Sequence, residues 1–95
     1  MSRNRVSVVW EQQITLNGDV GVSRFTDQKG EQTLVSPVSA EYGSKFSFKV
    51  ECNDAYYVSS VKVDGTEITP SDDIYTIPKV NKNSVVDVVT QRVIP

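Results

Sequence analysis

The sequence predicts a small all-β domain, either a sandwich or a partly open barrel of about seven or eight short antiparallel strands. Short runs of alternating apolar and polar residues recur at roughly 8–12-residue spacing, with turn residues between them. No window of helical length carries an apolar stripe with helical spacing. Alanine, the strongest helix former, occurs only at positions 40 and 55. We therefore read residues 1–95 as a single β-rich domain.

The chain begins with its longest alternating run, over residues 6–16. This run predicts one long strand, or two strands with a bulge near residues 11–13, because side chains of a strand alternate between its two faces. Trp10 is expected to anchor the core. Gln12 interrupts the apolar face, whose members are Val6, Val8, Trp10, Ile14 and Leu16.

One turn and one proline organise the rest of residues 1–41. The dipeptide Asn17-Gly18 is a hairpin signal, so residues 20–26 are expected to pair back onto residues 14–16. Residues 32–35 form a short strand, and Pro37 predicts an edge or crossing segment after it. Because an edge strand carries unpaired backbone groups, Gln32 and Leu34 are candidate interface residues.

Residues 42–90 contain the clearest strand signals. Residues 46–52 place Phe46, Phe48, Val50 and Cys52 on one face. A second strand is expected to place Tyr57, Ser59, Val61 and Val63 on one face. Asp64-Gly65 predicts a hairpin turn into residues 66–69. Residues 74–77 and 84–90 are the remaining expected strands. The last strand has valines at both odd and even positions, so the sequence does not show which of its faces points inward.

Two residue types in this segment need a choice between core and contact. Cys52 is the only cysteine, so it forms no disulfide within the chain, and its phase with Phe48 favours a buried site. Tyr56 and Tyr57 are adjacent and must face opposite sides of a strand, so one of them is exposed. We take Tyr56 as a candidate contact residue, with a half-buried strand position as the alternative.

The segment 42–89 resembles the repeat modules of bacterial surface proteins, the internalin-type B repeats and the loosely related Ig-like or β-grasp modules. Gly43 matches the glycine before their first strand, and Tyr56 or Tyr57 matches a Gly-Tyr position in which Ala55 replaces glycine. The remaining matches are Val61, Val63, Gly65, Tyr75 and Ile77. The resemblance implies a small Ig-like β-sandwich with an adhesive or structural role, and it carries over no catalytic or binding residue.

Composition excludes several kinds of chemistry. The chain has no histidine, which removes the commonest general base and the Ser-His-Asp triad. A net charge of −2 argues against nucleic acid as a partner. Arg3 and Arg5 are the only basic cluster, a solvated terminus or a docking arm. Aspartates at turns (54, 64, 72 and 73) either make local turn bonds or bind calcium weakly, and the first is favoured. We expect no cofactor, no metal and no enzymatic activity.

The start of the chain lacks the apolar core of a signal peptide, and no run is long enough for a membrane helix. We therefore expect a non-catalytic structural or binding protein, a small accessory or decoration protein of a phage virion or similar assembly, made in the host cytoplasm. Residues 1–41 would dock it to a capsid or tail protein, and a homo-oligomer is possible. The alternative is a module of an exported protein on the bacterial cell surface, acting as a spacer or adhesin.

Overall fold

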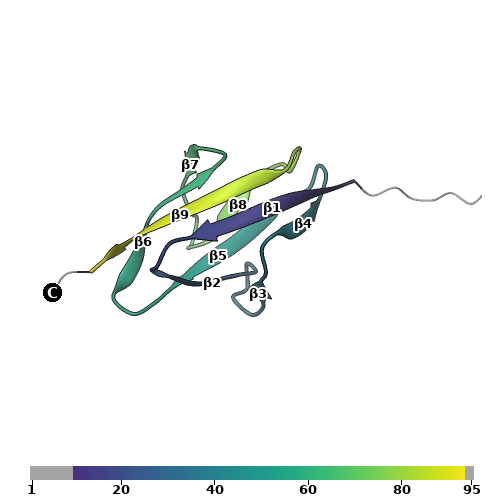
Figure 1. Cartoon of the computed structure of the whole chain (residues 1–95). Coiled ribbons are helices and arrows are strands. Elements are labelled where there is room, and N and C mark those ends of the chain that lie inside the picture. Colours follow the sequence, from purple (N-terminus) through teal and green to yellow (C-terminus); the bar gives the residue numbers. More distant parts are fainter. Residues whose placement is uncertain (1–9, 94–95) are drawn as a thin grey trace, which may run out of the picture.

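A computed structural model describes residues 10–93, which form strands and turns without any helix. The chain runs through nine strands (Figure 1). Their bounds are β1 (Glu11–Gly18), β2 (Val22–Thr26), β3 (Thr33–Leu34), β4 (Val38–Glu41), β5 (Phe46–Cys52), β6 (Tyr56–Val63), β7 (Thr66–Ile68), β8 (Tyr75–Ile77) and β9 (Ser84–Arg92).

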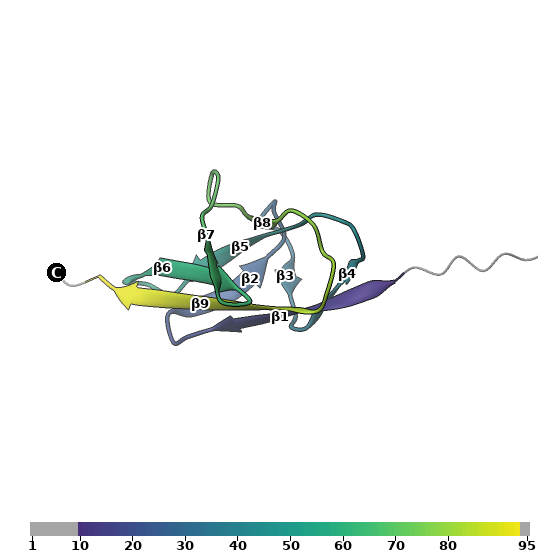
Figure 2. The same cartoon turned by 90° about the horizontal axis from the view of Figure 1, so that it is seen from above.

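The nine strands form two sheets that lie as two layers (Figure 2). The five-stranded sheet has the order β4-β1-β9-β6-β7, and the four-stranded sheet has the order β3-β2-β5-β8. The all-β prediction is confirmed, and residues 10–93 form two sheets that do not close into a barrel. The predicted purely antiparallel pairing is wrong in one place, because β1 and β9 run parallel, from Ile14↔Ser84 to Gly18↔Val88.

The core lies between the layers and draws on both sheets. Its largest fully buried side chain is Phe48 of β5, whose ring stacks on Phe46 and Tyr75 with centroids 5.7 and 5.6 Å apart. Phe25 of β2 tilts against the same ring at 6.2 Å. The other buried apolar residues are Ile14, Leu16, Ala40, Val61, Ile77, Val80, Val86 and Val88. The alternating patterns of the sequence therefore fill the space between two sheets, as in other two-layer folds.

The inner face of β9 is set by the even positions. Ser84, Val86 and Val88 are buried, while Val85 and Val89 are exposed. The sequence could not show which face of β9 points inward, because valines stand at both odd and even positions. β9 is flanked by β1 and β6, so its two backbone edges are both paired.

The turn after β1 does not make the hairpin that Asn17-Gly18 predicts. β1 and β2 lie in different sheets, and β1 pairs with β4 and β9 instead. The reversal occurs three residues later, at Val20-Gly21, where the Val22 amide donates to the Asp19 carbonyl at 3.1 Å. Gly18 itself lies in β1, paired with Val88. The prediction was wrong because pairing β1 with β9 takes the strand edge that a hairpin partner would need.

The turn at Asp64-Gly65 is the hairpin that the sequence predicts. It joins β6 to β7, with Val63 paired to Thr66. Asp64 and Gly65 have φ values of 51° and 86°, the positive values that this turn type requires.

A bulge in β6 changes which side chains face inward. The register with β9 shifts between Val58 and Ser60. Tyr57 and Ser59 are therefore exposed, although Val61 is buried and Val63 packs against the core. The predicted shared face of these four residues was wrong, because a bulge adds one residue to a strand and reverses the side-chain phase beyond it.

The chain crosses between the sheets around Pro37. β3 is an edge of the four-stranded sheet and β4 is an edge of the five-stranded sheet, as the proline predicted. The parallel pair β1 and β9 gives the molecule a direction: β1 starts at one end and β9 finishes at the other (Figure 1). We call these ends the N-terminal pole, at Trp10, and the C-terminal pole, at Val93.

Candidate interaction surfaces

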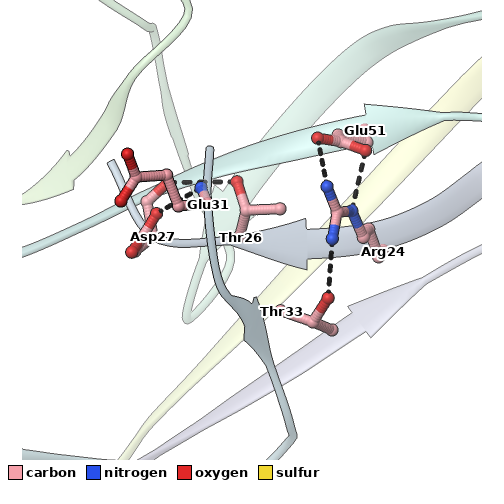
Figure 3. Close-up of polar contacts among 6 residues, drawn as sticks. All are labelled: Arg24, Thr26, Asp27, Glu31, Thr33 and Glu51. Carbon is pink, nitrogen blue, oxygen red and sulfur yellow. Dashed lines mark hydrogen bonds and ion pairs between the residues drawn. The ribbon is translucent and has the colours of Figure 1, made fainter. Parts of the chain in front are cut away.

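The edge strand β3 is held down by an ion pair and hydrogen bonds on the outer face of its sheet. Arg24 of β2 donates two hydrogen bonds to the Glu51 carboxylate, at 2.8 and 3.0 Å, and a third to the Thr33 hydroxyl at 2.8 Å (Figure 3). The hydrogen bonds from Arg24 hold the pKa of Glu51 below its ordinary value. The three strands β5, β2 and β3 are thereby linked through one guanidinium.

The loop between β2 and β3 closes around Asp27. Its carboxylate accepts from the Glu31 amide at 2.9 Å and from the Lys29 amide at 3.2 Å, and these bonds, that from Glu31 first, lower its pKa. The loop lies beside Thr26, which is fully buried (Figure 3).

Of the two predicted contact residues near β3, Gln32 is exposed as expected, but Leu34 is half-buried and packs against the core. The contact role of Leu34 stays a prediction, and its side chain points toward the interior of the sandwich.

Trp10 lies on the surface of the N-terminal pole and not in the core. It is 64% exposed and meets the ring of Tyr42, itself 47% exposed, at a centroid distance of 6.1 Å and an angle of 75°. The Tyr42 amide donates to the Trp10 carbonyl at 2.6 Å, which extends the β1–β4 pairing by one step. The core prediction was wrong because Trp10 precedes the first residue of β1, and nothing among residues 10–93 buries its ring. Exposed aromatic pairs are typical anchors at protein interfaces.

Of the two adjacent tyrosines, Tyr56 takes the half-buried strand position that was the alternative to a contact role. Tyr56 is half-buried, and its ring packs over Gly21, where an added Cβ would lie 2.6 Å from Cδ1. Tyr57 is the exposed one, at 51%. Tyr57 was placed on the inner face because the bulge after Val58 could not be seen in the sequence.

Asp19 fixes the turns at the C-terminal pole. Its carboxylate accepts hydrogen bonds from the Thr90 hydroxyl, from the Thr90 amide at 2.8 Å and from the Gly21 amide at 3.1 Å. The bonds from Thr90 lower the pKa of Asp19. Asn53 adds a link to the same turn, since its side-chain amide donates to the Val20 carbonyl at 3.0 Å. The turns after β1 and β5 and the end of β9 are thus joined.

A groove of about 610 Å³ opens beside β5 and β6, on the side where their sheets have short outer strands. β8 pairs with β5 only from Phe46 to Phe48, and β7 pairs with β6 only from Val61 to Val63. The groove lies past the ends of both, with Val50, Cys52, Tyr57, Val58, Asp73 and Tyr75 among its lining residues. We call it the edge groove.

Cys52 lines the edge groove and is half-buried, less enclosed than the core site that the sequence predicted. Burial, followed by the nearby Asp19 carboxylate, raises the pKa of its thiol. A raised thiol pKa keeps the thiolate scarce at neutral pH, so the side chain acts as an apolar lining group there.

The turn aspartates lie in different loops. Within residues 10–93, no three acidic or cysteine side chains gather as metal ligands. Asp64 accepts a hydrogen bond from the Val85 amide at 2.9 Å, a local role for its carboxylate. Arg3 and Arg5, the other predicted contact residues, lie outside the described residues. That described part of the chain also holds no helix that could cross a membrane.

Comparisons with protein-family models, with curated protein sequences and with solved structures found no match to this chain. The surfaces above are therefore described from geometry alone. The sequence indicated β3 as an edge strand, but it missed the aromatic pair at the N-terminal pole and the edge groove. The groove could not be found from local patterns, because it depends on where β7 and β8 stop relative to β6 and β5.

Proposed function

We propose that this domain is a non-catalytic structural and binding module of a larger protein assembly. The observation that carries the proposal is the path of the chain, which enters at the N-terminal pole and leaves at the C-terminal pole through the parallel pair of β1 and β9. A domain whose two ends lie at opposite poles can contact one neighbouring protein or domain at each pole. The exposed pair of Trp10 and Tyr42 at one pole supplies aromatic anchors for such a contact.

The first setting that we propose is an accessory or decoration protein of a phage virion or similar particle. In that setting residues 1–41 dock to a capsid or tail protein, with Arg3, Arg5, Trp10 and Gln32 at the contact. Support comes from the exposure of Gln32, directly before the edge strand β3, and of Trp10 at the N-terminal pole. Protein surface edges of this kind can add to a neighbour's sheet.

A second setting, a spacer or adhesin module on the bacterial cell surface, is favoured by the pole-to-pole path itself. The residues that resemble the B repeats fit a small Ig-like sandwich: Gly43 has a φ of 85°, and Val61, Tyr75 and Ile77 are buried. Tandem modules need consecutive domains to join end to end, which opposite poles allow.

One fractionation tests the proposal. A lysate of the source cells is separated on a density gradient, and the protein is followed by mass spectrometry. We expect it to travel with large particles at a fixed ratio to a shell or tail protein, or to occur in the envelope as part of a longer chain. The first result favours the virion setting and the second the cell-surface setting. Recovery only as a free small protein would overturn both.

A further inference from the structure

The edge groove contains a strand edge that lacks a neighbour among residues 10–93. The Asn53 amide donates to the Gly21 carbonyl at 2.8 Å, so at this position the backbone of the chain after β5 points toward β2. In an antiparallel sheet the amides and carbonyls of successive residues point to alternate sides. The backbone groups of Val50 and Cys52 therefore point to the opposite side, toward the edge groove.

β8, the strand next to β5 on the side of the edge groove, ends before it reaches Val50 and Cys52. β8 runs antiparallel to β5 and pairs Phe48 with Tyr75. The preceding residues leave the sheet, because Asp72 and Asp73 have φ values of 53° and 64° in a tight reversal closed by Ser71 and Ile74. A strand could lie where β8 would have continued, along residues 49–52.

The walls of the edge groove suit an apolar strand face. Val50 and Val58 are half-buried and pack against the core, and Tyr75 is buried behind them. Tyr57 stands at the rim, 51% exposed. If an added strand has apolar side chains at alternate positions, those side chains would all contact the apolar floor formed by Val50, Val58 and Tyr75.

We propose that residues 3–9 of a second copy of this chain bind in the edge groove as an added strand beside β5. This inference deepens the proposed function, on which it rests, by naming a partner within the assembly. The segment reads Arg-Asn-Arg-Val-Ser-Val-Val, so Val6 and Val8 share one face and Arg5 and Ser7 share the other. With Val6 and Val8 on the apolar floor, Arg5 lies on the outer side, where Asp73 lines the groove and Glu51 is already paired with Arg24.

Chain length favours a second copy over the same copy. β1 has eight residues, so it spans about 27 Å between the poles at ~3.4 Å per residue. In the sequence, residues 3–9 come before Trp10, which lies at the N-terminal pole. Residues 49–52 lead into the turn at the C-terminal pole, where the Val93 amide donates to the Ala55 carbonyl. Seven extended residues cover about 24 Å and would be used up in reaching the groove of their own copy.

The test uses Cys52, the only cysteine of the chain, as a reporter in the edge groove. Full-length Val6→Cys, Val8→Cys and Ser7→Cys proteins are oxidised with diamide at equal concentration and mildly alkaline pH, and products are separated without reductant. In the added strand, the side chains of Val6 and Val8 point to the same side of the sheet as Cys52 of β5. Ser7 points to the opposite side and is the matched control. We expect at least tenfold more disulfide-linked multimer from the two valine positions than from Ser7→Cys.

Three further results complete the test. Peptide mapping should identify the bond to Cys52, adding Cys52→Ser should abolish the multimers, and the parent protein should show concentration-dependent association by sedimentation that Val8→Pro weakens. Equal cross-linking at positions 6, 7 and 8, or a parent that stays monomeric at all concentrations, would overturn the inference. A monomer that still travels with large particles would leave the proposed function standing, so the two failures are distinguishable.

Discussion

Two turns of this domain use similar residues and are held in different ways. The turn at Asp64-Gly65 closes the hairpin of adjacent strands β6 and β7, with both residues at positive φ. The turn at Asp19–Gly21 connects strands of different sheets and is held by Thr90 of β9, 71 residues later in the chain. The first turn is fixed by its own backbone preferences, and the second by a long-range contact.

The difference explains which residues each turn tolerates. Gly65 has open space where a Cβ would be, and only its φ of 86° favours glycine. Gly21 is buried, and a Cβ there would lie 2.1 Å from Thr90 Oγ1 and 2.6 Å from Tyr56 Cδ1. Glycine is thus required for backbone conformation in one turn and for close packing in the other.

Replacing each glycine in turn should separate the two kinds of turn. Gly21→Ala should lower the free energy of unfolding by about 3 kcal/mol, because overpacking at a close contact forces neighbours to move. Gly65→Ala should cost about 1 kcal/mol, the strain of an alanine at positive φ. Urea unfolding followed by tryptophan fluorescence or circular dichroism measures both.

The comparison of the two glycines has a built-in control. Tyr56→Ala removes one of the groups that an alanine at position 21 would strike, so part of the Gly21→Ala loss should be absent in that background. Equal losses for Gly21→Ala and Gly65→Ala would show that the turn at the C-terminal pole is not closely packed.

The hydroxyl of Thr90 should matter less than the space beside Gly21. Thr90→Val keeps the shape of the side chain and removes the hydrogen bond to Asp19. We expect a loss below half that of Gly21→Ala, since the Thr90 amide still donates to the same carboxylate at 2.8 Å. Thr66→Val, at an exposed position of β7 beside the other turn, is the matched control and should leave the midpoint of unfolding nearly unchanged. A Thr90→Val protein as stable as that control would contradict a role for the hydroxyl.

Acid should weaken the long-range turn. Hydrogen bonds lower the pKa of Asp19, Asp27 and Glu51 in the folded protein, so the unfolded chain binds more protons in the acid range. The stabilisation is present above the ordinary values of 3.8 for aspartate and 4.5 for glutamate and is lost as pH falls through the lower folded values. Thermal unfolding from pH 6 to pH 2 should show the melting temperature falling with pH. In Asp19→Asn this fall should be less steep, because Asp27 and Glu51 still contribute. An equally steep decline in Asp19→Asn would exclude Asp19 as a contributor.

Local patterns predicted the all-β class, the strand at residues 46–52, the hairpin at Asp64-Gly65 and the crossing at Pro37. Each of these depends on neighbours in the sequence, on alternation or on a turn residue. The parallel pairing of β1 with β9, the bulge in β6 and the edge groove depend on strands far apart in the chain. The Asn17-Gly18 prediction failed for the same reason, because a long-range partner occupied the strand edge that the hairpin required.

Replacing Trp10 and Phe48 in turn should separate surface aromatics from core aromatics. Phe48 has no exposed surface, and Phe48→Ala should cost about 4 kcal/mol through lost burial and a cavity. Trp10 is 64% exposed and contacts Tyr42 at the N-terminal pole, so Trp10→Ala should cost at most about 1 kcal/mol, the value of an aromatic pair. Circular dichroism in urea measures both variants without relying on the single tryptophan. A loss for Trp10→Ala near that of Phe48→Ala would mean that the pole is covered in solution by another part of the chain or by a second copy, and would remove Trp10 from the free contact surface.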